Sequence, residues 1–92
     1  MLIYKGNLKM GPDGTSKIVE ALIKNVSVKD LNLEGNNFGN RGAFIIGEYI
    51  RKTHVLMSLN LSLNFINQYG IKKIVDGMKF NKSIKSLILC NF

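Results

Sequence analysis

The sequence has few of the residues that most chemical sites require. It contains one cysteine and one histidine, so Cys90 has no second cysteine with which to form a disulfide. One histidine and one cysteine cannot by themselves complete the four-ligand shell of a structural zinc site. Without a disulfide pair, no oxidising compartment is implied. These shortages argue against a disulfide-stabilised scaffold and against a zinc domain.

Long apolar runs and acidic residues are also scarce. No run approaches the roughly 20 apolar residues that span a bilayer. The apolar stretch that begins at Met1 is too short, and too quickly interrupted by Lys5, to be a signal peptide. We therefore expect no membrane span and an intracellular, cytoplasmic location. Six acidic residues against 13 Lys and Arg give a net charge of +7, which favours acidic partners. No cluster of cations is denser than a pair such as Arg51-Lys52, so nucleic-acid binding is not favoured.

An internal repeat is the most informative feature of these 92 residues, which suffice for one domain. The segments Leu31-Asn32-Leu33, Leu59-Asn60-Leu61 and Leu87-Ile88-Leu89 lie 28 residues apart. Further positions match at the same spacing: Val28, Leu56 and Ile84; Asn36 and Asn64; Phe38 and Ile66; Gly42 and Gly70; Ile46 and Ile74; Ile50 and Met78. Leu2 aligns with Leu31 at an offset of 29, so one extra residue falls within residues 8–10.

The two halves of the repeat have different periods. Leu-x-Leu has period two, which places both leucines on one face of a strand. Ile46 and Ile50 recur at helical spacing, and Gly42 is small where the helix start approaches the strand layer. The Asn side chain can bond turn backbone that lacks a strand partner, so Asn7, Asn36 and Asn64 should form a ladder. We expect strands near 2–4, 31–33, 59–61 and 87–89, helices near 13–24, 41–52 and 69–80, and Asn40 as an N-cap.

This pattern resembles the leucine-rich repeat, in the 28-residue form found in ribonuclease inhibitors. Similar repeats occur in NOD-like receptors, Ran GTPase-activating proteins and, more loosely, tropomodulins. The resemblance implies an α/β solenoid, a right-handed β-α superhelix with parallel strands on the concave face and helices on the convex face. It also implies protein–protein recognition as the common role. The scaffold is specified strongly by such a motif and the partner hardly at all.

The repeat divides residues 1–92 into about three and a half units, at 2–30, 31–58, 59–86 and a partial 87–92. The last unit departs from the pattern because Phe92 stands where the ladder Asn belongs. Neither end carries a recognisable polar cap, and uncapped repeats expose apolar surface and strand edges. We therefore expect either a fragment of a longer array or end-to-end association of copies.

The outward side chains of the strands form the candidate binding surface. Asp30, Asn32 and Glu34 share one strand face and make its acidic, polar cluster. The equivalent positions of the next repeat are Ser58, Asn60 and Ser62. We predict that these six residues bind a protein partner from the concave side. An ordinary solvated strand face, with Lys5 partly neutralising Glu34, is the alternative.

No enzyme, cofactor or metal site is predicted. Two carboxylates are fewer than the several oxygens of a calcium site, His54 suits a solvated or capping role, and Cys90 has no activating base beside it. A GTPase-activating or other regulatory repeat domain is an alternative function, and a basic nucleic-acid-binding module is a second. The nucleic-acid alternative has little support, because such binding uses exposed aromatic rings that stack on bases. We expect at least partial packing of the candidate rings, which are those of Phe44, Tyr49, Tyr69 and Phe80.

Overall fold

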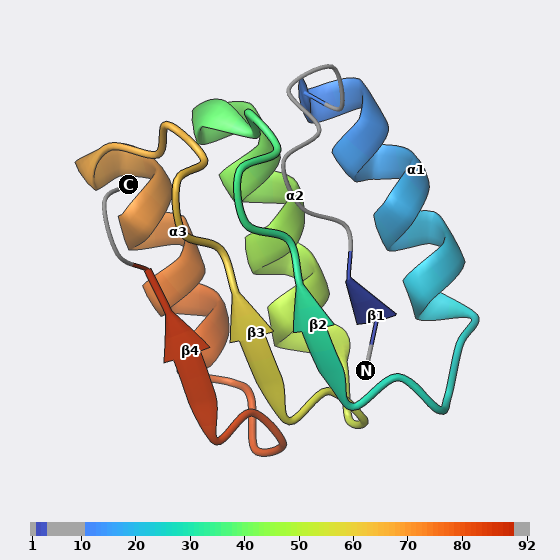
Figure 1. Ribbon diagram of the computed structural model, residues 1–92. Helices are drawn as coiled ribbons and strands as arrows, with labels where there is room; N and C mark the ends of the chain where they lie inside the picture. Colours follow the sequence, from blue (N-terminus) through green and yellow to red (C-terminus); the bar gives the residue numbers. More distant parts are fainter. Residues whose placement is uncertain (1, 4–10, 90–92) are drawn as a thin grey trace.

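Short strands alternate with helices along the chain. The structure is a computed structural model that describes residues 2–3 and 11–89. Its elements in order are β1 (Leu2–Ile3), α1 (Gly11–Ile23), β2 (Asp30–Asn32), α2 (Gly39–Lys52), β3 (Ser58–Asn60), α3 (Gln68–Met78) and β4 (Ser86–Ile88). Figure 1 shows two layers, with the strands in one and the three helices side by side in the other. The architecture is therefore a small α/β arrangement with parallel strands.

The register of the sheet follows the 28-residue repeat. The strands are parallel and lie in chain order, β1-β2-β3-β4. Leu31 pairs with Leu59 and Leu59 with Leu87, so the partners in β2 to β4 are 28 residues apart. Leu2 pairs with Leu31, which confirms the offset of 29 in the first unit. The extra residue expected within 8–10 lies outside the described residues.

Several boundaries differ from those expected. Strands β2, β3 and β4 begin and end one residue earlier, and α1 and α2 begin two residues earlier, at Gly11 and Gly39. Both glycines have positive φ angles, of 56° and 63°, which glycine adopts without a Cβ clash. The prediction that Asn40 is an N-cap is wrong, since Phe38 holds that position in α2. Asn40 lies inside the first turn, and its Nδ2 donates instead to Oδ1 of Asn67, at 2.6 Å.

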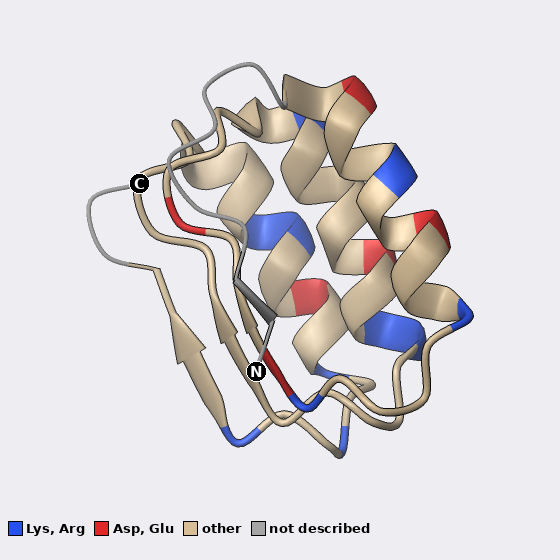
Figure 2. Cartoon of the chain, turned by 45° about the vertical axis from the view of Figure 1, so that its right-hand side comes forward, with Lys and Arg blue, Asp and Glu red and all other residues tan. Residues whose placement is uncertain are grey.

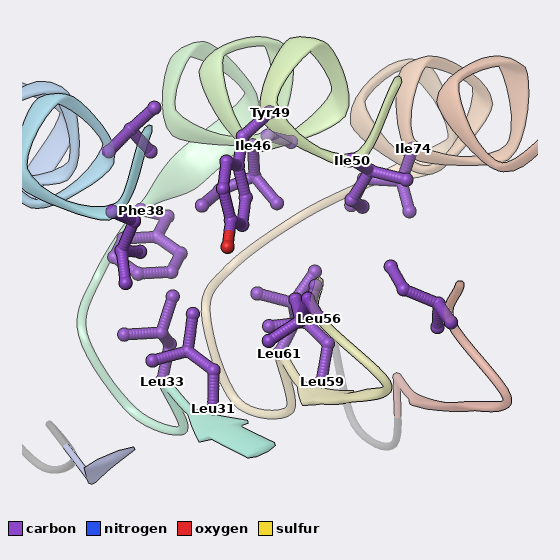
Figure 3. Packing of buried hydrophobic residues seen from close by; sticks show 14 of the residues in the cluster. Leu31, Leu33, Phe38, Ile46, Tyr49, Ile50, Leu56, Leu59, Leu61 and Ile74 are labelled. Carbon is purple, nitrogen blue, oxygen red and sulfur yellow. The ribbon is translucent and has the colours of Figure 1, made fainter. Parts of the chain in front are cut away.

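The apolar core lies between the sheet and the helices. Side chains alternate along a strand, so the two leucines of each Leu-x-Leu segment point toward the helix layer. Leu33 and Leu61 occupy equivalent positions of the repeat and are fully buried, whereas Leu89, the third such residue, is only partly buried. Figure 3 shows the strand leucines facing apolar side chains of α2 and α3, among them Ile46, Ile50 and Ile74.

Buried asparagines join neighbouring repeats behind the sheet. Asn36 and Asn64 are both fully buried. Oδ1 of Asn64 accepts the N–H of Asn36 at 2.6 Å, and its Nδ2 donates to the carbonyl oxygens of Leu33 and Leu61 at 2.8 and 3.0 Å. Nδ2 of Asn36 also donates to the Leu33 carbonyl, at 2.8 Å. The predicted ladder is confirmed for this pair, and Asn7 lies outside the described residues.

Helices α2 and α3 pack closely enough for their backbones to meet. A Cβ added at Gly77 would overlap the carbonyl oxygen of Gly47, and one added at Gly47 would lie 2.8 Å from the carbonyl oxygen of Lys73. Glycine is therefore the residue that fits at both positions without moving a helix. These glycines therefore allow the close packing of α2 against α3.

Candidate functional site

Most of the residues predicted to bind a partner lie on the sheet face that points away from the helices. Asp30 and Asn32 alternate in β2 with an inward leucine, and the register places Asp30 beside Ser58 and Asn32 beside Asn60. These four residues and Ile88 of β4 line a shallow hollow of about 150 Å³. The structure thus brings together two neighbouring strands of the candidate surface, with β4 at its border.

Glu34 and Ser62 follow β2 and β3 in the chain. Glu34 is partly exposed, whereas Ser62 is almost fully buried. We therefore use the name sheet-face patch for the five accessible residues, which are Asp30, Asn32, Glu34, Ser58 and Asn60.

Hydrogen bonds between strands orient both carboxylates of the sheet-face patch. The hydroxyl of Ser58 donates to Oδ1 of Asp30 at 2.6 Å. Nδ2 of Asn60 donates to Oε1 of Glu34 at 3.3 Å. Each bond leaves the carboxylate with further lone pairs for an outside donor. The acids are therefore held in place before any partner arrives.

The two asparagines of the sheet-face patch also brace the ends of their strands. Oδ1 of Asn32 accepts the N–H of Glu34 at 3.0 Å, and Oδ1 of Asn60 accepts the N–H of Ser62 at 3.0 Å. This bond from a side chain to the backbone two residues on satisfies an N–H at the end of the strand. Sequence reasoning assigned these asparagines to binding alone, but they have a structural role as well.

The patch is acidic on a basic protein. Asp30 and Glu34 take part in none of the ion pairs among the described residues, which involve Glu48 and Asp76 of the helix layer. The expected neutralisation of Glu34 by Lys5 concerns a residue outside the described part of the chain. Two carboxylates on one face that belong to none of these ion pairs attract a basic or hydrogen-bond-donating group.

A turn beside the sheet-face patch carries two exposed apolar residues that sequence reasoning missed. Leu63 and Phe65 follow β3, are 47% and 69% exposed, and have positive φ angles of 59° and 57°. The same positions of the preceding repeat hold Gly35 and Asn37, also at positive φ. The sequence signal was therefore the mismatch at these positions, where residues suited to a left-handed turn give way to Leu and Phe.

The aromatic residues divide between core and surface. Tyr49 is buried, and this burial raises the pKa of its phenol, while a hydrogen bond with Thr53 acts in the opposite direction. Phe44, Tyr69 and Phe80 are each at least half exposed, so of the four aromatics expected to pack at least partly, Tyr49 is the one that is buried. Phe44 and Tyr69 lie in α2 and α3, and Phe80 lies in the turn after α3.

Other chemistry has little support in the described residues. No group of three or more His, Cys, Asp or Glu side chains there could hold a metal ion. His54 is exposed in the loop between α2 and β3, and Cys90 lies outside the described residues. No helix in this part of the chain is long and apolar enough to cross a membrane. What the sheet-face patch offers is hydrogen bonding and charge.

Comparison with known proteins points to repeat proteins. No protein-family model matches the chain. It is 30% identical over 88 residues to leucine-rich repeat-containing protein 45 of Gallus gallus, covering 94% of this chain and 13% of that protein. It is 34% identical over 82 residues to leucine-rich repeat-containing protein AAC1 of Dictyostelium discoideum, covering 86% of this chain and 10% of that protein. The chain thus spans about a tenth of the length of these relatives, both of which are named for leucine-rich repeats.

A solved structure is also similar. The fold superposes on leiomodin-1 actin-binding site 2 with a TM-score of 0.83 and 25% sequence identity, covering 95% of this chain and 53% of that one. The leiomodin chain is named for binding actin. Together with the relatives above, it places this chain among proteins named for repeats or for binding.

Proposed function

We propose that this chain is a protein-interaction module whose sheet-face patch contacts a protein partner. The observation that carries the proposal is the pair of carboxylates, Asp30 in β2 and Glu34 just after it, each held by a hydrogen bond from a side chain of β3. Groups already fixed in position lose little conformational freedom on binding, so more of their interaction energy appears as affinity. The exposed turn with Leu63 and Phe65 adjoins the patch and adds apolar area to the same surface.

We further propose that the module is a leucine-rich-repeat solenoid of the ribonuclease-inhibitor type. The units at 2–30, 31–58, 59–86 and 87–92 would then stack in a right-handed superhelix with the sheet on the concave side. The 28-residue register of the sheet and the asparagine ladder support this proposal. Catalytic and GTPase-activating functions have no comparable support, and we do not propose them.

Actin is the first partner to test, because leiomodin-1 actin-binding site 2 shares the fold at a TM-score of 0.83. Co-sedimentation with filamentous actin and fluorescence anisotropy with monomeric actin cover both forms. We expect Asp30→Asn with Glu34→Gln to weaken binding. The matched control is Asp13→Asn with Glu20→Gln, which removes two negative charges as well, but from exposed positions of α1. An equal loss in both variants would contradict a role for the sheet face.

A photo-cross-linking experiment tests the surface without assuming actin. A photoreactive residue would replace Asn60 of the sheet-face patch in one variant and Lys17 of α1 in the other. After irradiation in native lysate, the proposal predicts discrete protein adducts from position 60 that the Asp30→Asn, Glu34→Gln changes reduce. Adducts formed only from position 17 would assign binding to the helix layer instead.

A further inference from the structure

The loops that lead from each helix to the next strand lie together at one edge of the molecule (Figure 1). They fall within the equivalent segments 23–29, 51–57 and 79–85, which are 28 residues apart. The first, second, fourth and seventh residues of every segment are exposed. We call the side chains at these positions the basic edge.

Positive charge dominates the basic edge. Seven of its side chains are Lys or Arg, and none is acidic. Arg51 and Lys79 each pair with an acid three residues earlier in the chain, Glu48 and Asp76 respectively. No ion pair among the described residues engages the other cations, which are Lys24, Lys29, Lys52, Lys82 and Lys85. Figure 2 shows Lys and Arg gathered along this lower edge, whereas the two signs of charge are mixed over the helices.

Apolar side chains project among these cations. Val26 is 80% exposed, and Ile23, Met57 and Phe80 are exposed as well. Exposed aliphatic side chains beside lysines suit the boundary between the head groups and acyl chains of a bilayer. There the ammonium groups meet lipid phosphates while the aliphatic groups leave water.

Hydrogen bonds between the loops hold the basic edge in one shape. The N–H of Met57 donates to the carbonyl oxygen of Lys29 at 2.7 Å. In the next loop, the N–H of Lys85 donates to the carbonyl oxygen of Met57, also at 2.7 Å. Nδ2 of Asn81 reaches back across the loops to the carbonyl oxygen of Ile50, at 2.7 Å. The lysines and the apolar side chains are therefore displayed from a fixed backbone.

Nucleic acid is the competing anionic partner, and the aromatic content of the edge disfavours it. Binding of single strands relies on aromatic faces that stack on bases. The basic edge has two aromatic rings, those of Phe80 and His54. The guanidinium of Arg51 lies 5.3 Å from the centroid of the Phe80 ring and so occupies one face of it. The other exposed apolar groups, such as Val26, are aliphatic and offer no stacking surface.

We propose that the basic edge binds the surface of an anionic lipid bilayer, with the loops against the head groups and the chain remaining peripheral. The basic edge shares no residue with the sheet-face patch, but it adjoins that patch where Lys29 and Met57 directly precede Asp30 and Ser58. The proposal does not rest on the identity of any protein partner.

Vesicle co-sedimentation tests the proposal directly. Vesicles of phosphatidylcholine with about one third phosphatidylserine should bind the chain, and vesicles of phosphatidylcholine alone should bind it much less. Each basic residue near an anionic membrane contributes about 1 kcal/mol, or about fivefold in the partition coefficient. Lys82→Gln with Lys85→Gln should therefore lower binding by about 25-fold. Raising the salt concentration should weaken binding as well, because it screens surface charge.

The control removes the same charge elsewhere. Arg41→Gln with Lys72→Gln leaves the basic edge intact, and we expect at most a several-fold loss in vesicle binding. Equal losses in the two double variants would mean that net charge alone drives adsorption and would overturn the proposal. It would also be overturned if a labelled oligonucleotide bound the wild-type chain while anionic vesicles did not.

A fluorescent probe tests the orientation on the membrane. The chain contains no tryptophan, so a single Val26→Trp substitution reports on one site. Val26 is so exposed that the change should leave the fold intact, which circular dichroism can verify. With anionic vesicles, the emission of this variant should shift to shorter wavelength, whereas a Lys72→Trp variant should show no shift. The reverse pattern would place the helix layer against the lipid.

Discussion

Replacing Asn64 by leucine isolates the contribution of the asparagine ladder to stability. The substitution removes the acceptor for the N–H of Asn36 and the donor to the carbonyl oxygens of Leu33, Leu61 and Ser62. The Leu33 carbonyl keeps a hydrogen bond from Asn36, and the Ser62 carbonyl keeps one from the backbone. The main losses therefore fall on the Asn36 N–H and the Leu61 carbonyl.

Two buried groups deprived of these partners cost about 1–3 kcal/mol each, so Asn64→Leu should lower the free energy of unfolding by about 2–6 kcal/mol. A domain of this size has a total of about 5–14 kcal/mol, so the effect is a large share of it. Urea unfolding followed by circular dichroism measures the change. Gln68→Leu is the control, because Gln68 is exposed, and it should change stability by less than about 0.5 kcal/mol. A loss below about 1 kcal/mol for Asn64→Leu would refute the reasoning.

Three further outcomes follow from the core. Leu61→Ala should cost about 2–5 kcal/mol in the same urea assay, because it leaves a cavity at a fully buried site. Gly77→Ala should destabilise by about 1–3 kcal/mol despite the better helix propensity of alanine, because the new methyl group meets the Gly47 carbonyl; a gain in stability would contradict the close helix contact. Burial raises the pKa of Tyr49, so its contribution to stability is complete below about pH 10, the unfolded value, and is lost as the pH rises through the raised folded value. Tyr49→Phe should therefore flatten the fall in unfolding free energy above about pH 10, as urea unfolding at a series of pH values can measure.

The buried half of the molecule could be predicted because burial imposes one requirement at every repeat. An inward leucine such as Leu31 must match Leu59 and Leu87 in the sheet, and a 28-residue spacing records that match in the sequence. The ladder residues Asn36 and Asn64 follow for the same reason, since each repeat leaves the same turn backbone without a strand partner. Boundaries were less certain, because a strand can stop one residue earlier without exposing its leucines.

The exposed half could be predicted only in part. Strand alternation correctly placed Asp30 and Asn32 on the outward face, and the 28-residue spacing correctly set Ser58 and Asn60 beside them. The repeat could not show that the Ser58 hydroxyl would donate a hydrogen bond to Asp30. Strand alternation also could not show that Ser62 is buried, since the burial of this residue depends on how the chain turns after β3. The basic edge was missed because its lysines are scattered in the sequence and meet only when the loops are brought to one end.

In the turn after β3, two residues are poorly suited to the backbone conformation but expose apolar surface that a partner could cover. The equivalent positions of the turn after β2 hold Gly35 and Asn37, which accept a left-handed backbone at little cost. Leu63 and Phe65 adopt the same conformation at an estimated cost of about 1–2 kcal/mol each. Their side chains are largely exposed, so burial within the chain does not offset that cost. We infer that a partner covering the sheet-face patch also covers these two side chains and recovers the free energy by removing them from water.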